Sequence, residues 1–593
     1  MTEPRAEYAS RLARWRTRIV ELDRTHLRLS NSRLAVAGVG AVALWMAFVR
    51  PTIAPAWPVI AWLAFGALAV IHARLLQRVE RARSAERVYL RGLDRLAGRW
   101  SGTGRDGVEF LGDHPYARDL DLFGRGSLFE LLNTARTEVG EATLADWLRV
   151  PARIEEVRVR QTAVDELRPL VDFREDLAVL AAESPVGRTG PLAAWAASAP
   201  RRFPAALRVL LATFAAITAG LAVAAYDQIV SAGWVAVWIL AEGAIASIWR
   251  RRVHHVLHAI ETPERDLGLL AELLGRVERE RFTSPLLVAL QQALVTDGVP
   301  PSRRIAQLGG LVSWLDSTHN LMFAPIAYVL LVRPQLALAI DRWHDAYGPA
   351  VADWLRVIGK LEALSALGTY AYERQADPFP ELVEDGALFE ADALRHPLIA
   401  DEVSVGNDLR LGGSGPRVII VSGSNMSGKS TLLRSVGVNV ALALAGAPVR
   451  AARLRLSPLA LGATLHIEDS LQAGHSRFYA EILRIRTIVD AARGPVPLLF
   501  LLDEILHGTN SFDRRIGAEG IVRALVGLGA VGLVTTHDLA LTELPSMLGS
   551  AAVNMHFADR LEHGRMIFDY RMRPGVVEHS NALALMRAIG LDV

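Results

Sequence analysis

The chain has 593 residues, no cysteine and a formal net charge of +2. This length exceeds the roughly 100 to 200 residues of one domain, so we expect several folding units. The lack of cysteine excludes disulfides, thiolate zinc sites and cysteine nucleophiles, and the small net charge does not by itself indicate nucleic-acid binding. Hydrophobic residues make up 51% and charged residues 22%, so the position of the apolar residues must separate the soluble class from the membrane class.

Residues 1–33 are rich in arginine and carry Leu12, Trp15, Ile19 and Leu22 at helical spacing. This pattern predicts an amphipathic helix. A solvated or membrane-surface helix is the preferred interpretation of its charges, and a nucleic-acid-binding arm is the alternative.

Apolar runs follow in two pairs. They cover residues 34–49, 59–71, 209–226 and 229–249. With flanking residues, each run approaches the roughly 17 to 25 residues that cross a bilayer, and each is apolar all round. Arginines flank the pairs but are scarce in the connecting loops, so the positive-inside rule predicts four spans, with both termini and the whole central segment in the cytoplasm of a multi-pass cell-membrane protein. Buried soluble helices are the alternative.

One carboxylate, Glu242, interrupts the fourth run. An intramembrane carboxylate is a functional candidate by default. Here Arg250 follows two helical turns later, so snorkelling or a structural ion pair is the preferred interpretation. The apolar run Leu321–Leu331 is too short to span a membrane and is predicted to be a buried cytosolic helix.

A phosphate-binding loop is the clearest motif. The β-branched run Val418–Val421 leads into "GSNMSGKST" and then an apolar helix-like segment. Backbone N–H groups of such a loop bind phosphate oxygens, Lys429 reaches the β and γ phosphates, and Ser430 ligates Mg²⁺. The predicted nucleotide-binding residues are Gly423, Ser424, Asn425, Met426, Ser427, Gly428, Lys429, Ser430 and Thr431.

Two later strands supply the remaining chemistry. "PLLFLLDE" predicts a buried strand that ends at Asp503, which would hold Mg²⁺ through water, and Glu504, which would orient or deprotonate the attacking water. "VGLVTTHD" predicts a strand that ends at His537. A histidine there points into the crevice at the carboxyl ends of parallel strands, so a γ-phosphate sensor is preferred over a structural histidine. Ser476, which lies between the phosphate loop and the strand that ends at Asp503, is a candidate helix cap.

Together these motifs resemble the MutS family of DNA mismatch-repair ATPases, a branch of the ABC-type ATPases. "GSNMSGKST", with its Asn-Met pair, is similar to the family's phosphate loop, "TTHD" to its His switch, and "DEILHGTNSFD" to its acidic strand and following loop, where Asp513 takes a D-loop-like position. The resemblance implies an enzyme that hydrolyses ATP with Mg²⁺ and works as a homodimer through its ATPase domains. It places Ser476 in a signature helix that reaches the γ phosphate of the partner subunit, and makes Glu504, His537 and Lys429 the catalytic residues.

The resemblance extends upstream, because residues 127–167 and 351–373 are similar to the family's helical core and lever. It implies a multidomain α and α/β fold: a helical lever/core domain with two transmembrane hairpins, and a C-terminal P-loop ABC-type α/β ATPase domain. No counterpart of the mismatch-reading domain precedes the lever, and a Phe-x-Glu tripeptide at Phe173 is a chance match inside lever-like helices. The predicted domains are an Arg-rich helix (1–33), hairpin 1 (34–73), linker helices (74–116), the first lever leg (117–205), hairpin 2 at the family's DNA-clamp position (206–250), the return leg (251–375) and the ATPase domain (376–593).

Two functions stay open. The first is a membrane-anchored MutS-like ATPase that binds mismatched or branched DNA. The second is an ATP-driven membrane machine or scaffold that uses the same motor without mismatch recognition. An ordinary ABC transporter is a weaker third, because its LSGGQ-like signature is missing and a long cytosolic segment separates the two hairpins.

Overall fold

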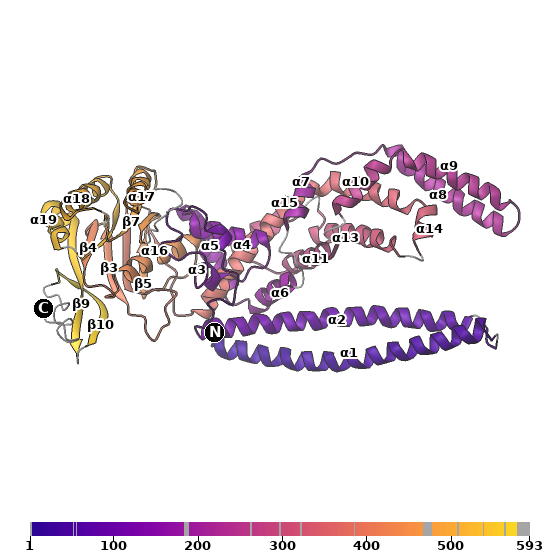
Figure 1. Ribbon diagram of the computed structural model, residues 1–593, viewed down its shortest axis with the longest axis horizontal. Coiled ribbons are helices and arrows are strands. Elements are labelled where there is room, and N and C mark those ends of the chain that lie inside the picture. Colours follow the sequence, from indigo (N-terminus) through magenta and orange to yellow (C-terminus); the bar gives the residue numbers. More distant parts are fainter. Residues whose placement is uncertain are drawn as a thin grey trace.

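The computed structural model describes residues 3–50, 52–54, 56–182, 189–260, 264–295, 298–320, 323–384, 386–465, 477–506, 509–537, 539–562 and 565–577. Figure 1 shows an elongated molecule with the strands at one end of its long axis, a helical middle, and two helical hairpins that extend toward the other end. The predicted combination of a helical region with a C-terminal α/β domain is confirmed.

The first hairpin consists of two long antiparallel helices, α1 (Pro4–Phe48) and α2 (Ala56–Leu96). The arginine-rich segment and the first apolar run belong to the same 45-residue helix, so the helix expected over residues 1–33 does not end before the run begins. Toward the connection between the helices, large apolar side chains such as Leu34 and Leu63 are 71% and 68% exposed.

A set of short helices follows and builds the helical middle. They are η1 (Val108–Phe110), α3 (Leu128–Leu132), α4 (Glu138–Arg149), α5 (Ile154–Leu167), α6 (Val171–Ala182) and α7 (Thr189–Ala197). Two of them begin at side-chain caps, because Ser127 accepts a hydrogen bond from Glu130 N at 3.2 Å and Thr137 accepts one from Gly140 N at 3.0 Å. Such caps satisfy backbone N–H groups that have no partner within the helix.

The second hairpin consists of α8 (Ala205–Tyr226) and α9 (Ala232–Ser247), and α10 (Arg250–Ile260) continues α9 with a 71° bend. By length and apolar composition, three helices of the described chain can cross a membrane, namely α1, α2 and α8. The expected count of four is reached only if α9 and α10 form one bent span.

Five helices lead back to the C-terminal domain. They are α11 (Glu264–Arg279), α12 (Pro285–Ala293), α13 (Pro301–Ser317), α14 (Ala324–Val329) and α15 (Val332–Glu373). The 42-residue α15 measures about 63 Å at 1.5 Å per residue. It packs against α4, α5, α7 and α13, so it is the long helix around which the middle region is assembled.

The short apolar segment around α14 differs from the prediction. Ile326 and Tyr328 are 52% and 71% exposed, so the expectation of a buried helix over 321–331 is wrong. The helix is only six residues long and lies beside the base of hairpin 2, where few elements cover it (Figure 1). Residues 321 and 322 lie outside the described part of the chain.

The C-terminal domain contains two sheets. A four-stranded sheet has the order β1-β5-β2-β3, and a six-stranded sheet has the order β10-β9-β4-β8-β7-β6. The strands are β1 (Glu381–Leu382), β2 (Leu388–Leu394), β3 (Asn407–Gly412), β4 (Val418–Ser422), β5 (Arg453–Leu456), β6 (Ala460–Thr464), β7 (Leu498–Asp503), β8 (Val531–Thr536), β9 (Ala552–Glu562) and β10 (Arg565–Pro574). The strands β6, β7, β8, β4 and β9 run parallel, and β10 pairs with β9 in the antiparallel sense.

Helices cover both faces of the six-stranded sheet. They are α16 (Lys429–Ala445), α17 (Arg477–Ala491), α18 (Ser511–Gly527) and α19 (Leu544–Leu548), with the turns η3 (Leu539–Glu543) and η4 (Gly549–Ala551). Alternate residues of β4 belong to different cores: Ile419 packs with α16, whereas Ile420 packs with α17 and α18. This period of two on strands buried on both faces is typical of an open α/β sheet. Ligands of such sheets bind at the carboxyl ends of the strands.

Candidate nucleotide site

The loop after β4 has the backbone geometry of a phosphate cradle. Gly423 and Gly428 adopt φ angles of +152° and +104°, which side chains disfavour. A Cβ at Gly423 would lie 3.0 Å from the carbonyl oxygen of Phe557, and one at Gly428 would lie 3.1 Å from the Tyr570 ring. Glycine is therefore required here both for conformation and for space, and the loop leads directly into the N-terminus of α16.

Lys429 folds back over this loop. Its Nζ donates hydrogen bonds of 2.9 Å to the carbonyl oxygens of Gly423 and Ser424 and lies 3.8 Å from Glu504 Oε1. Burial lowers the pKa of Lys429 below its ordinary value, although the nearby carboxylates of Glu504 and Asp503 act in the opposite direction. The ammonium group is thus held inside the cradle, where its positive charge would attract an incoming anion.

The carboxyl ends of β7 and β8 lie beside the loop, as parallel neighbours. The Thr535 hydroxyl donates to Asp503, and the backbone N–H of Glu504 donates to Thr535 O at 3.2 Å. Glu504 adopts a positive φ of 48°, and its Oε1 lies 3.3 Å from His537 Nδ1. The structure therefore brings four predicted site residues, Lys429, Asp503, Glu504 and His537, to one point.

A cavity of about 650 Å³ opens over this cluster. Its lining includes the loop residues Asn425, Met426, Gly428, Lys429, Ser430 and Thr431 together with Asp503 and Glu504. Apolar and aromatic side chains, among them Ile399, Val403 and Tyr570, also line it. Burial lowers the pKa of His396, another lining residue, to about 4, with a further lowering by Arg434. His396 is thus neutral at physiological pH and adds no charge to the cavity.

The residues present fit a nucleotide with a divalent cation. The hydroxyl oxygens of Ser424 and Ser427 are buried in the cradle without a hydrogen-bond partner, and the loop's N–H groups with Lys429 suit phosphate oxygens. Ser430 and Asp503 line the same cavity and supply the oxygen ligands that Mg²⁺ prefers. The apolar and aromatic side chains of the cavity lining offer a surface on which a flat base could pack.

Two other predicted residues stand apart from this cluster. Ser476 lies outside the described residues. Asp513 is exposed in the first turn of α18, where its N–H donates to the side chain of Asn510 at 2.9 Å and its carboxylate accepts from the Asn510 amide at 2.8 Å. Its observed contacts are those of a reciprocal helix cap.

Sequence reasoning missed two contributors to the site. Thr535 fixes Asp503 and Glu504, and the buried Glu481 of α17 accepts a hydrogen bond from Leu506 N just after β7. Thr535 within "VTT" and Glu481 on the apolar side of α17 are weak signals in a single sequence. Their contacts with the site become visible only when the arrangement of the strands is known.

Comparisons with known proteins agree with this geometry. The family model of MutS domain V, the family's ATPase domain, matches residues 419–592. The DNA mismatch repair protein MutS of Brevibacillus brevis (strain 47 / JCM 6285 / NBRC 100599) is 29% identical over 252 residues, which cover 42% of this chain and 29% of that protein. The chain thus matches less than a third of this relative's length. The C-terminal part of the chain is therefore similar to the ATPase domain of the MutS family.

Proposed function

We propose that this protein is a membrane-anchored MutS-like ATPase, in which ATP binding and hydrolysis move helices that are joined to two membrane hairpins. One observation carries the proposal: both apolar hairpins extend to the end of the molecule opposite the nucleotide site (Figure 1), while a buried ion pair fixes the base of hairpin 1 to the end of α15. The domain with the nucleotide site and the apolar hairpins are thus connected through the same long helix, α15.

The site residues have defined roles in this proposal. The loop residues 423–431 hold the phosphates, Lys429 neutralises their charge, and Ser430 and Asp503 hold Mg²⁺, which supplies charge stabilisation when bound. Glu504 orients or deprotonates the attacking water. His537, beside Glu504, senses the γ phosphate. By the family resemblance, Ser476 contacts the nucleotide of a second copy, and Asp513 lies at the interface of that homodimer.

A short segment of the helical middle touches the ATPase domain at three places. Asp119, which is 1% exposed, accepts a hydrogen bond from Leu465 N at the end of β6 at 2.9 Å. Its carbonyl oxygen accepts from Arg434 Nε of α16 at 3.2 Å, and its carboxylate lies 3.5 Å from Arg484 of α17. Because α16 begins at the phosphate loop, a shift of α16 relative to α17 would act directly on this segment.

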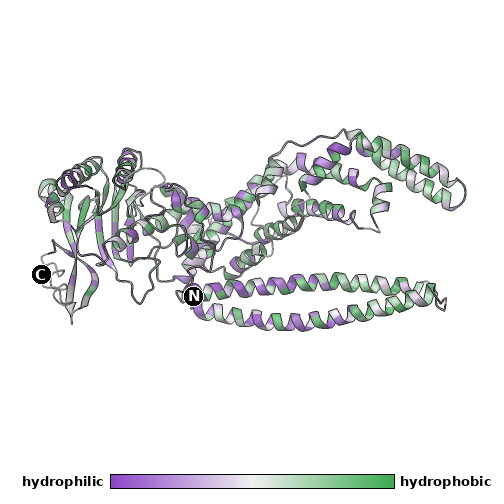
Figure 2. Ribbon diagram, viewed as in Figure 1, coloured by the Kyte–Doolittle hydropathy of each residue, from purple (hydrophilic) through white to green (hydrophobic). Residues whose placement is uncertain are grey.

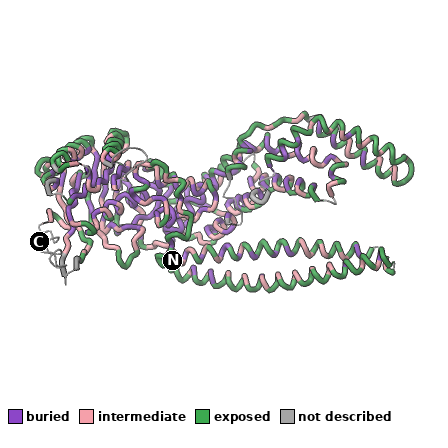
Figure 3. Tube along the Cα trace, in the orientation of Figure 1, coloured by how far each residue is buried: buried purple, intermediate pink, exposed green. Residues whose placement is uncertain are grey.

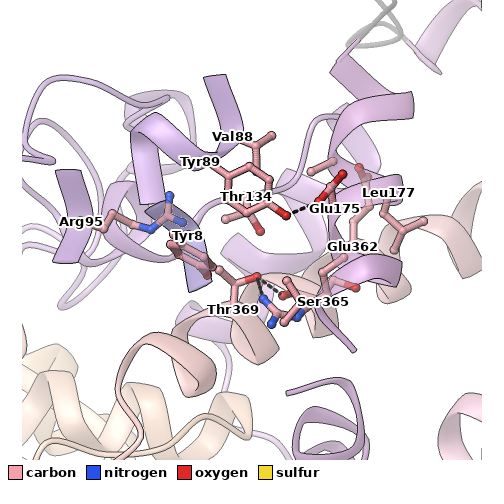
Figure 4. A pocket seen from close by; sticks show the side chains of 13 residues that line it. Tyr8, Val88, Tyr89, Arg95, Thr134, Glu175, Leu177, Glu362, Ser365 and Thr369 are labelled. Atoms are coloured by element: carbon pink, nitrogen blue, oxygen red, sulfur yellow. Dashed lines mark hydrogen bonds between the residues drawn. The ribbon is translucent and has the colours of Figure 1, made fainter. Parts of the chain in front are cut away.

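The base of hairpin 1 is attached at the C-terminal end of α15, which leads into the ATPase domain (Figure 1). Arg95 of α2 forms a two-pronged pair with Glu373, the last residue of α15, with distances of 2.6 Å and 2.9 Å. Tyr8 of α1 donates to the same carboxylate at 3.2 Å. Figure 4 shows Tyr8, Tyr89, Arg95 and Glu175 around a common pocket, with the Tyr89 hydroxyl directed at Glu175 of α6. Buried charge-assisted contacts of this kind are rigid, so α15 and hairpin 1 should move together.

The surface of the hairpins supports a membrane as their environment. Figure 2 shows hydrophobic residues concentrated in the distal halves of both hairpins, and Figure 3 shows that much of this surface is exposed. Val39, Leu63, Val223 and Leu240 are between 62% and 74% exposed. An apolar surface of this size is unfavourable in water but matches the hydrocarbon core. We infer that the flanking arginines place the N-terminus, lever and ATPase domain in the cytoplasm.

DNA binding of the mismatch-repair type is a second candidate function. It is favoured by the relation to a DNA mismatch repair protein over 252 residues. In this version the cytosolic levers of a homodimer hold mismatched or branched DNA near the membrane. In the membrane-machine version the motor acts on lipid or a membrane partner without mismatch recognition, and hairpin 2 takes the clamp's place.

The experiment is an ATPase assay on the full chain in lipid nanodiscs, with homoduplex, mismatched or branched DNA added in turn. We expect Mg²⁺-dependent turnover that falls at least about a hundredfold in Glu504→Gln while ATP binding persists. Stimulation by DNA with a steep salt dependence supports the repair version. If no DNA changes turnover or binds in the submicromolar range, the repair version fails. Release of the protein from membranes by an alkaline wash would refute the membrane anchor itself.

A further inference from the structure

The base of hairpin 2, where α8, α9 and α10 meet (Figure 1), carries a group of exposed arginines. This arginine collar consists of Arg201, Arg202, Arg208, Arg250, Arg251 and Arg252. Its members surround one apolar cluster, in which Phe203 and Trp249, with ring centroids 6.2 Å apart, pack beside the buried Leu207 and Leu211. Because Phe203, Leu207 and Trp249 are direct sequence neighbours of collar residues, their packing brings arginines from α8 and α10 to one level of the hairpin.

The collar lies about one hydrocarbon thickness from the tip of hairpin 2. The range Val209–Tyr226 contains no charged residue and measures about 27 Å at 1.5 Å per residue, against about 30 Å for the hydrocarbon core of a bilayer. Trp249 lies at the level of the collar, and tryptophan is enriched where a membrane meets water. The next step rests on the membrane anchor proposed above: with α8 across the bilayer, the collar lies among the lipid headgroups on the cytoplasmic side.

The ion pair between Glu242 and Arg250 that the sequence suggested is not formed. Glu242 is 3% exposed and accepts a hydrogen bond of 2.6 Å from the hydroxyl of Thr218 on α8. Arg250 lies past the 71° bend between α9 and α10 and eight residues away, about 12 Å along a helix. The charge of Arg250 is therefore not used inside the hairpin.

Most of the collar's positive charge is not neutralised by the protein. Arg208, Arg250 and Arg251 form no ion pair within the described part of the chain. The carboxylates that face the collar belong to α15: Asp345 lies 3.2 Å from Arg202, and Asp341 is 5% exposed and accepts from the backbone N–H of Arg201 at 2.8 Å. Two carboxylates against six arginines leave a surplus of positive charge at this level.

The exposed arginines of hairpin 1 provide a contrast. Arg16 lies 2.9 Å from Glu86, and Arg18 lies 3.0 Å from Glu21. Their charges are balanced by carboxylates of the same hairpin. The unpaired state of Arg208 and Arg250 is thus a property of the collar and not of exposed arginines throughout the molecule.

We propose that the arginine collar binds the headgroup of an anionic glycerophospholipid at the base of hairpin 2. The planar guanidinium group donates two parallel hydrogen bonds to phosphate oxygens, and basic clusters beside membrane helices attract anionic lipids. The acyl chains would lie along the apolar surface that continues from the collar, where Val209 and Ile248 are 68% and 74% exposed. A free phosphate or a nucleic acid has the phosphate group but no apolar part to match this surface.

A lipid titration of the full chain tests the collar. A polarity-sensitive fluorophore on Ala206→Cys, an exposed position in the first turn of α8, reports binding beside Arg208. The protein is purified in a neutral detergent and titrated with phosphatidylglycerol, with phosphatidylcholine of the same acyl chains, with inorganic phosphate and with a DNA duplex. Each arginine near an anionic lipid contributes about fivefold in affinity. We therefore expect phosphatidylglycerol to bind at least about tenfold more tightly than phosphatidylcholine, and neither phosphate nor DNA to change the signal.

Variants locate the binding in the collar. Arg208→Gln combined with Arg250→Gln should weaken phosphatidylglycerol binding about 25-fold, whereas lysine at both positions should retain the preference because the charge remains. The matched control, Arg16→Gln with Arg18→Gln in hairpin 1, should change the affinity by at most about twofold, since these arginines are already paired.

Three results would overturn the proposal. They are equal affinities for the two lipids, undiminished phosphatidylglycerol binding in the double glutamine variant of the collar, and a response to inorganic phosphate or DNA as strong as that to phosphatidylglycerol. The titration needs no ATP turnover. A protein that resists an alkaline wash but lacks the lipid preference would refute the collar site alone, whereas release by the wash would refute the membrane anchor.

Discussion

The ion pair between Arg95 and Glu373 gives the sharpest test of how hairpin 1 is attached. The two side chains are 12% and 5% exposed. Burial alone lowers the pKa of Arg95, but Glu373 more than offsets this and raises it above its ordinary value. Glu373→Gln leaves the guanidinium buried without a counter-charge, which costs about 3–5 kcal/mol. At about 1.4 kcal/mol for each factor of ten, local opening of the hairpin base should rise at least about a hundredfold.

Hydrogen exchange of the full chain in nanodiscs measures this opening. Amides near the start of α1 and the end of α2 should lose at least about two decades of protection in Glu373→Gln. The matched control is Glu86→Gln, which removes an ion pair of 2.9 Å to Arg16, a residue that is 56% exposed. Such surface pairs contribute about 0–1 kcal/mol, so protection should fall at most about fivefold. Equal protection in the two variants would refute the reasoning that the buried pair holds the hairpin.

Two further predictions concern the nucleotide site and the helical middle. Lys429→Ala removes the charge from the phosphate cradle and should weaken ATP binding at least about tenfold in a titration with fluorescent ATP, and an unchanged affinity would contradict the assigned site. Burial raises the pKa of Glu362 on α15 to about 7, although hydrogen bonds from Thr137 and Arg136 act in the opposite direction. Because the folded state then binds the proton more tightly than the unfolded state, the contribution is complete below about pH 4.5 and is lost as the pH rises to about 7, a change of roughly 3 kcal/mol. Wild type should therefore lose melting temperature relative to Glu362→Gln between these pH values, and a constant gap would contradict the assignment.

The elements of the candidate nucleotide site could be predicted from sequence because they are local. A strand, a glycine loop and a helix follow each other directly from Val418, and each acidic or histidine residue comes at the end of its own apolar strand. The carboxyl ends of neighbouring parallel strands must meet, so Asp503, Glu504 and His537 could be grouped before the fold was known. Thr535 could not be recognised in this way, since its role depends on which strand lies next to β7.

The helical region was less predictable because its contacts join distant parts of the chain. Residues 1–33 read as a separate amphipathic helix, but helical hydrogen bonding continues through Phe48 without a capping residue or a proline to end it. Arg95 and Glu373 are 278 residues apart, and nothing in either local sequence indicates the other. The same holds for Glu242, whose nearest charge along the helix suggested a partner, whereas the fold supplied Thr218 from the neighbouring helix.

The most direct test of the central claim is a distance measurement between the two hairpins during the nucleotide cycle. The chain has no cysteine, so spin labels can be placed at introduced Val59→Cys and Val237→Cys, both at exposed apolar positions, in a Glu504→Gln background in nanodiscs. If the ATPase domain moves α15 and hairpin 1, the distance distribution should change when Mg²⁺-ATP is added, and the change should be lost in Lys429→Ala. Identical distributions with and without ATP, in protein shown to bind it, would contradict the coupling of the motor to the membrane hairpins.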